Sequence, residues 1–214
     1  MESDYRNWLW EKWAERCVKN LIKNEFDARF VPDIPAAAAT IMELAAPFES
    51  FGFGGSDTTR SLGIIEKLKA AGKTIHDHWQ SDLSKEEDLS IRLAQGRCDC
   101  FLCSANAISA TGEIINVDGI GNRTNAMTFG TKKVVIVAGM NKVTPDLDSA
   151  LKRVRDVAAP MRAKSLNMKT PCAESGRCSD CRVPQRICRI TAILHRKPML
   201  TDISVVLIGQ SLGF

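Results

Sequence analysis

Lys133-Val-Val-Ile-Val137 is one lysine followed by four β-branched apolar residues, and this stretch decides the fold class. A continuous apolar run of this length is typical of a strand buried on both faces, as in a parallel sheet. Three further short runs are β-rich or apolar: Cys98–Cys103, Glu113–Val117 and Ser204–Ile208. Around these runs apolar residues recur at helical spacing. Strands that alternate with helices predict an α/β protein, with a mostly parallel sheet flanked by helices.

The first 46 residues are predicted to form an N-terminal helical arm, ahead of an α/β domain that spans residues 47–214. Within residues 5–26 a helix places Trp10, Trp13 and Leu21 on one face. This face is expected to pack on the domain or on a second protomer, which would make a homodimer through the arm. Docking of the tryptophans on another partner or a membrane surface is the alternative interpretation.

Four cysteines fall in the 17-residue stretch Cys172-Ala-Glu-Ser-Gly-Arg-Cys178-Ser-Asp-Cys181-Arg-Val-Pro-Gln-Arg-Ile-Cys188. Short loops between thiolates allow four sulfurs to converge on one soft metal centre. A [4Fe–4S] cluster with these four ligands is our first interpretation. Structural zinc is the second, although such sites more often have two Cys-x-x-Cys pairs. Disulfides are the third and need an oxidising compartment. Three other cysteines are expected to fill the core: Cys98, Cys100 and Cys103.

The composition is that of an ordinary globular protein, with 214 residues, 44% hydrophobic and 25% charged. The net charge is only +4 and the basic residues are scattered, which argues against a nucleic-acid partner. No apolar run approaches the roughly 20 residues that span a bilayer, and the first residues lack the pattern of a signal peptide. We therefore expect a cytoplasmic protein with no membrane span, in which thiols stay reduced.

Two polar segments follow candidate strands and are candidate binding loops. The first is a glycine turn, Gly54–Thr58, whose amides near Ser56 would receive a carboxylate or phosphate. The second is the loop Asn116–Arg123, in which Arg123 offers a charge-assisted contact and Asp118 a base or positioning acceptor. Both loops are expected at the carboxyl edge of one sheet, where they would form one anion pocket. The predicted catalytic residues are Asp118 and Arg123, and the predicted substrate-binding residues are Gly54, Gly55, Ser56, Thr58, Asn106, Asn116 and Asn122.

Purely structural interpretations stand beside these. The glycine turn is also what a tight turn before a helix needs. Asn and Asp in the second loop often bond their own backbone, and Arg123 would then be a structural partner of Asp118.

Several motifs together resemble the lactate-utilisation (LUD) domain family. They are Gly54-Gly-Ser-Asp-Thr58, Ser104-Ala-Asn-Ala-Ile108, Gly112-Glu-Ile-Ile-Asn-Val-Asp-Gly119, Gly121-Asn-Arg123, Phe129-Gly130 and Val137-Ala-Gly-Met-Asn-Lys142. The cysteine loop is similar to that of a short, stand-alone branch of the family. The resemblance implies a fold akin to the sugar-phosphate isomerase and coenzyme A transferase superfamily. It also implies oxidation of lactate or related small acids together with redox partner subunits.

The expected function is thus an iron–sulfur redox or electron-transfer component, part of an oxidoreductase, that binds a small carboxylate or phosphate-bearing substrate. The alternative is a non-redox transferase- or isomerase-like enzyme, or an interaction subunit, with a structural zinc site.

Overall fold

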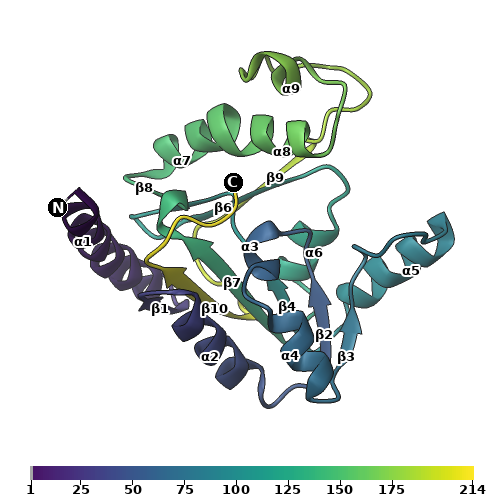
Figure 1. The fold of residues 1–214 in the computed structure, drawn as a ribbon, viewed down its shortest axis with the longest axis horizontal. Coiled ribbons are helices and arrows are strands. Elements are labelled where there is room, and N and C mark those ends of the chain that lie inside the picture. Colours follow the sequence, from purple (N-terminus) through teal and green to yellow (C-terminus); the bar gives the residue numbers. More distant parts are fainter. Residues whose placement is uncertain (1) are drawn as a thin grey trace.

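The structure is a computed structural model that describes residues 2–214, and its centre is a six-stranded parallel sheet (Figure 1). Its strands run in the order β1 (Asp27–Val31), β10 (Asp202–Ile208), β7 (Lys133–Gly139), β4 (Cys100–Cys103), β2 (Ser50–Phe53) and β3 (Thr74–His76). β7 pairs with β10 on one side and with β4 on the other, and all seven of its residues are buried. The predicted α/β class is confirmed.

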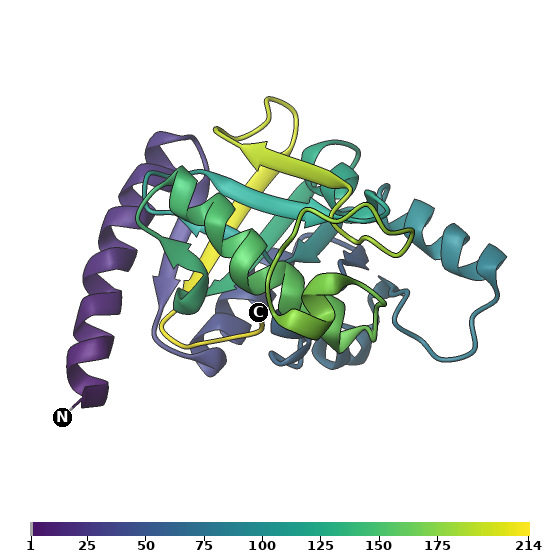
Figure 2. The same ribbon diagram turned by 90° about the horizontal axis from the view of Figure 1, so that it is seen from above.

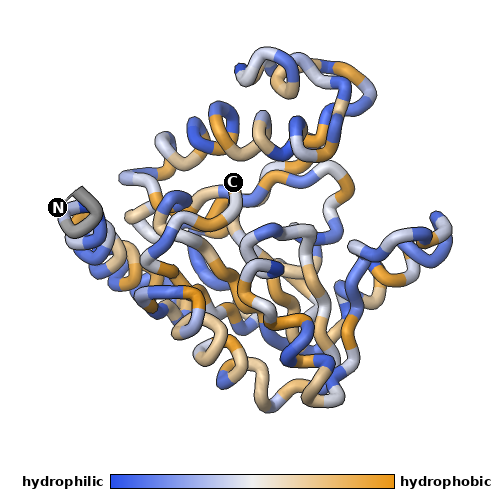
Figure 3. Tube along the Cα trace, viewed as in Figure 1, coloured by the Kyte–Doolittle hydropathy of each residue, from blue (hydrophilic) through white to orange (hydrophobic). Residues whose placement is uncertain are grey.

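The two faces of this sheet carry separate hydrophobic cores, which explains the continuous apolar run in β7. Val134 and Ile136 face a core shared with α1 (Glu2–Lys23) and α6 (Asn122–Thr128). Val135 and Val137 face the opposite core, shared with α2 (Ile34–Ala45) and α4 (Ile64–Ala70). Side chains alternate across a strand, so a strand covered by helices on both faces needs apolar residues at every position. Figure 3 shows hydrophobic residues gathered along these strands.

A second sheet lies over the carboxyl side of the first. Its strands run β8 (Val143–Thr144), β5 (Ala107–Ser109), β6 (Ile114–Asp118) and β9 (Ile190–Leu194). The segment predicted at Glu113–Val117 therefore belongs to this sheet and not to the parallel one. The reason is the short connection around Gly112, which has φ of 102°, because a tight turn returns the chain as an antiparallel hairpin.

A long helical segment covers the second sheet. It consists of α7 (Leu147–Arg153), a π-helical turn η2 (Val154–Ala158) and α8 (Ala159–Ser165). Ala150 and Val154 pack on Ala107 and Ile115 of the sheet. In Figure 1 this segment runs above the carboxyl ends of the main strands, with α9 (Pro171–Ser175) and the cysteine loop beyond it. The remaining short elements are α3 (Asp57–Arg60), α5 (Lys85–Gln95) and η1 (Met140–Lys142).

The segment predicted to be an N-terminal helical arm contains a strand, β1. β1 is the edge strand of the parallel sheet and pairs with β10, so residues 1–46 are not purely helical. Its sequence, Asp-Ala-Arg-Phe-Val, has the mixed polarity of a half-exposed edge and lacks a continuous apolar run. In α1, Cys17 and Leu21 are fully buried, so this part of the helix packs on the domain. Figure 2 shows the N-terminal end of α1 extending beyond the sheet.

No helix in the described part of the chain is both long and apolar enough to cross a membrane.

Candidate functional site

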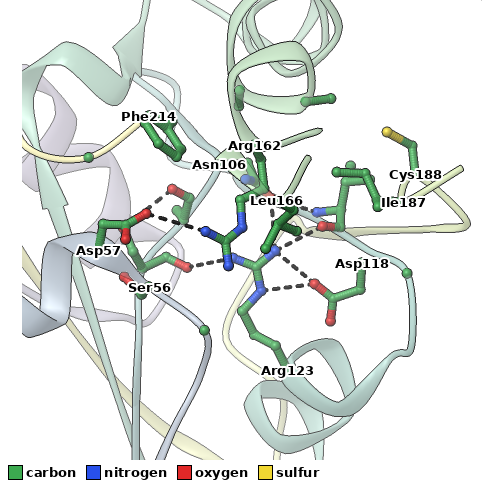
Figure 4. Close-up of a pocket in the computed structure, with 18 of the residues that line it drawn as sticks. Ser56, Asp57, Asn106, Asp118, Arg123, Arg162, Leu166, Ile187, Cys188 and Phe214 are labelled. Atoms are coloured by element: carbon green, nitrogen blue, oxygen red, sulfur yellow. Dashed lines mark hydrogen bonds and ion pairs between the residues drawn. The ribbon is translucent and has the colours of Figure 1, made fainter. Parts of the chain in front are cut away.

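A cavity of about 380 Å³ lies between the two sheets, under α8 (Figure 4). The turn after β2 forms one wall and the loop between β6 and α6 forms another. β2 and β6 belong to different sheets, so the expectation that both loops lie on the edge of one sheet is wrong. The loops nevertheless meet, because the antiparallel hairpin carries the end of β6 across the carboxyl edge of the parallel sheet.

Most of the predicted site residues line this cavity: Gly55, Ser56, Thr58, Asn106, Asp118, Asn122 and Arg123. Gly54 and Asn116 are not among the lining residues. Asn116 is fully buried; its side chain accepts from the Asn106 amide at 3.0 Å and donates to the Ser104 carbonyl at 3.2 Å. It therefore holds the cavity wall in place from behind.

Arg123 and Asp118 form a buried ion pair at the cavity floor. Arg123 Nε and Nη2 donate to Asp118 Oδ1 at 2.9 and 2.7 Å, and the two side chains are 11% and 8% exposed. Nη2 also donates to Asn106 Oδ1 at 2.9 Å, and Asp118 Oδ2 accepts from the Thr124 amide at 2.9 Å. Only Arg123 Nη1 is lightly engaged, with a single contact of 3.5 Å to the Ser104 carbonyl. The pair fixes the two side chains against each other, and Nη1 is the least engaged nitrogen of the guanidinium.

The glycine turn offers few free groups to an anion. The helix that follows it, α3, is a single turn of four residues. The Ser56 hydroxyl already accepts from the Thr59 amide at 3.2 Å, and Asp57 adds a carboxylate next to it. A short, already capped and acidic helix start is a weak anion site.

Two basic residues outside the predicted set, Lys142 and Arg162, also line the cavity. Arg162, from α8, points toward Arg123 in Figure 4; its guanidinium lies 4.9 Å from the Trp79 ring and 3.5 Å from Asp57. Lys142, at the end of η1, is only 4% exposed. The lining as a whole has four basic side chains (Arg92, Arg123, Lys142 and Arg162) and two carboxylates (Asp57 and Asp118). The excess of positive charge favours an anionic ligand.

The sequence did contain a signal for Lys142. It ends the short helix η1, which directly follows the fully buried strand β7, at the carboxyl end where ligands of parallel sheets gather.

The four loop cysteines line one small cavity of about 30 Å³ next to the larger one. Burial, followed by the nearby Cys172 thiol, raises the pKa of Cys188. Among the described residues no three His, Cys, Asp or Glu side chains stand in a metal-binding arrangement. The four cysteines thus line one space without forming such an arrangement.

Arg186 holds the cysteine loop in a closed shape. Its Nε donates to the Cys188 carbonyl and its Nη1 to the Cys181 carbonyl, both at 2.7 Å. Its Nη2 lies 2.8 Å from Asp180 Oδ1. These contacts keep both ends of the Cys181–Cys188 segment near each other.

The other cysteines are core residues, as predicted. Cys98, Cys100 and Cys103 are buried, and burial raises the pKa of Cys103 to about 12. Thiols of this kind are poor nucleophiles and ligands at neutral pH.

Comparison with known proteins agrees with this architecture. A crystal structure at 1.70 Å of a DUF162 family protein from Deinococcus radiodurans is similar, with a TM-score of 0.55. The likeness covers 93% of this chain and 98% of that chain at 12% identity, so it concerns the fold alone. No curated protein matches the chain. The LUD domain family model matches residues 14–208, which is most of the sequence. The chain belongs to the LUD domain family.

Proposed function

We propose that this chain is an iron–sulfur protein for the utilisation of lactate or a related small acid, acting as a redox or electron-transfer component. Membership of the LUD domain family links it to lactate utilisation. A [4Fe–4S] cluster held by Cys172, Cys178, Cys181 and Cys188 would supply one-electron transfer. The larger cavity would bind the acid.

One observation carries this proposal: the two cavities share a wall. Ile187 and Cys188 line the small space between the cysteines and also the large space between the sheets. Figure 4 shows Cys188 at the rim of the large cavity, on the side of α8. A molecule in the large cavity would therefore lie next to a ligand of the metal centre, an arrangement that suits electron exchange between the two.

The lining residues fit a small carboxylate. Arg162 and the Nη1 group of Arg123 offer guanidinium donors from opposite sides, which suits a planar two-oxygen anion. The side-chain oxygen of Asn106, Oδ1, accepts from Arg123 Nη2 at 2.9 Å and from the Val117 amide at 2.8 Å, so it positions Arg123. Both oxygens of Asp118 already accept hydrogen bonds, which favours a positioning role over that of a base.

The test is the electron paramagnetic resonance spectrum of the anaerobically purified, dithionite-reduced protein, recorded with and without lactate. We expect lactate to change the cluster signal, and Arg162→Met to raise the lactate concentration required by roughly tenfold or more, the effect of losing a charge-assisted hydrogen bond. Arg155→Met is the matched control, because Arg155 is exposed in η2, seven residues before Arg162, and does not line the cavity. A signal that saturating lactate leaves unchanged would separate the cavity from the cluster and contradict the proposal.

A further inference from the structure

Lys142 is a buried amine without an acidic partner. Its Nζ donates to the hydroxyl oxygens of Thr58, at 2.9 Å, and Ser104, at 3.0 Å. None of the ion pairs between side chains that the structure describes includes it. Lys133, at the other end of the same strand, is buried to a similar degree but lies 2.6 Å from Asp202. A buried lysine is normally paired with an acidic group. Lys142 has no such partner among the described ion pairs, so it is suited to the negative charge of a bound ligand.

The charges around Lys142 are mostly of its own sign. Arg153 and Arg123 are the cations that act on it, and Asp57 is the carboxylate that opposes them. Burial is the largest influence; together with the two arginines it lowers the pKa of Lys142 to about 7. The other titratable side chains that line the cavity are Arg92, Arg162, Asp118, His78 and Cys188. The buried thiol of Cys103 also acts on the amine. Asp57 and Asp118 are themselves held by arginines.

The lysine is also covered on its far side. The backbone of the segment before Phe214 packs against it, since a Cβ built on Gly213 would lie 3.3 Å from Lys142 Nζ and 2.5 Å from Thr58 Oγ1. The amine is thus fixed between two hydroxyls, with the cavity as its open side.

We infer that Lys142 is the amine that receives the carboxylate of a small 2-hydroxy or 2-oxo acid, and that it takes up a proton when that acid binds. This inference rests on the proposed acid-binding cavity and adds a residue and a proton to it. An anion placed beside Nζ favours the ammonium form. The hydroxyls of Thr58 and Ser104 both accept from this amine and so hold it at the cavity wall. Linkage then requires that the acid binds more weakly as the pH rises above 7, because the proton must be supplied.

Isothermal titration calorimetry with lactate tests this at pH 8, in two buffers of different ionisation enthalpy. Lactate is fully ionised at this pH, so any proton taken up goes to the protein. We expect uptake of about 0.9 proton per lactate, the unprotonated fraction of an amine with a pKa near 7, and an affinity that falls about tenfold between pH 7.5 and 8.5. Lys142→Met should bind lactate roughly ten- to a hundredfold more weakly and without proton uptake. Lys133→Met is the control and should keep both properties.

A second measurement uses the unmodified chain and does not depend on a folded variant. Labelling of lysine amines with acetic anhydride across pH 5–11, followed by mass spectrometry of the Lys142 peptide, gives the midpoint of that amine with and without lactate. A midpoint near 7 that lactate moves upward supports the inference. Lactate binding without proton uptake, or an unmoved midpoint, would overturn it while leaving the acid-binding cavity intact. No lactate binding at all would overturn the cavity as an acid site and the inference with it.

Discussion

Replacing Arg123 with alanine should destabilise the whole domain, and the size of the effect follows from the contacts. The substitution removes the only basic partner that Asp118 has among the described residues. It leaves that carboxylate, 8% exposed, with a hydrogen bond from the Thr124 amide. It also frees Asn106 Oδ1 from one of its two donors. Breaking a buried ion pair from one side costs about 3–5 kcal/mol. That is a large part of the roughly 5–15 kcal/mol by which domains are stable.

The free energy of unfolding from urea titration, together with thermal melting, measures this effect. For a domain of this length each kcal/mol moves the melting temperature by about 2–4 °C, so Arg123→Ala should melt at least about 6 °C lower. Arg155→Ala, an exposed arginine of η2, should stay within about 0.5 kcal/mol of the parent. Adding Asp118→Ala to Arg123→Ala should cost less than Asp118→Ala alone, because the unpaired carboxylate is removed. An Arg123→Ala protein as stable as the Arg155→Ala control would refute the buried pair.

Three further predictions concern other parts of the chain. Cys178→Ser and Cys181→Ser should each abolish bound metal, since a hydroxyl is a poor soft-metal ligand, and full metal content in both variants would contradict the ligand assignment. Leu21→Ala should cost about 2–5 kcal/mol in urea unfolding, because α1 buries this side chain completely in the domain; an unchanged unfolding midpoint would mean that α1 is detached in solution. Lys142→Met should raise stability at pH 6, because burial lowers the pKa of Lys142 in the folded state and the charged amine then opposes folding. This gain should shrink by about 3–5 kcal/mol as the pH approaches 10, where the unfolded amine also begins to lose its proton, and a gain independent of pH would contradict the buried amine.

The strands that are buried on both faces could be predicted from the sequence, because their environment leaves a local pattern. β7 and β10 read as continuous apolar runs, since each faces a hydrophobic core on both sides. β1 left no such pattern, because an edge strand carries polar residues on its open side. The separate sheet around β6 was missed for another reason. The sequence of a five-residue strand with a buried face is similar whichever sheet the strand joins. Its sheet is decided by the strand it pairs with, which for β6 is β5.

The candidate site was predicted in part, for equally physical reasons. Polar residues next to glycines mark loops, so Asp118, Asn122 and Arg123 were selected together, and all three line the cavity. The contacts that each of them makes depend on distances that the spacing of residues along the sequence does not reveal. One such distance is the 2.7 Å between Arg123 Nη2 and Asp118 Oδ1. Arg162 lies on a helix distant in sequence from both loops, and only the packing of α8 brings it there.

The metal content of anaerobically purified protein tests the central claim most directly. Iron, zinc and acid-labile sulfide would be measured on the same sample, beside a variant in which Cys172, Cys178, Cys181 and Cys188 are all serine. The proposed cluster predicts a brown parent protein with about four iron and about four sulfide per chain, and a colourless variant with neither. A colourless parent that carries about one zinc per chain and no sulfide would contradict the account, and would assign the four thiols to a structural zinc site.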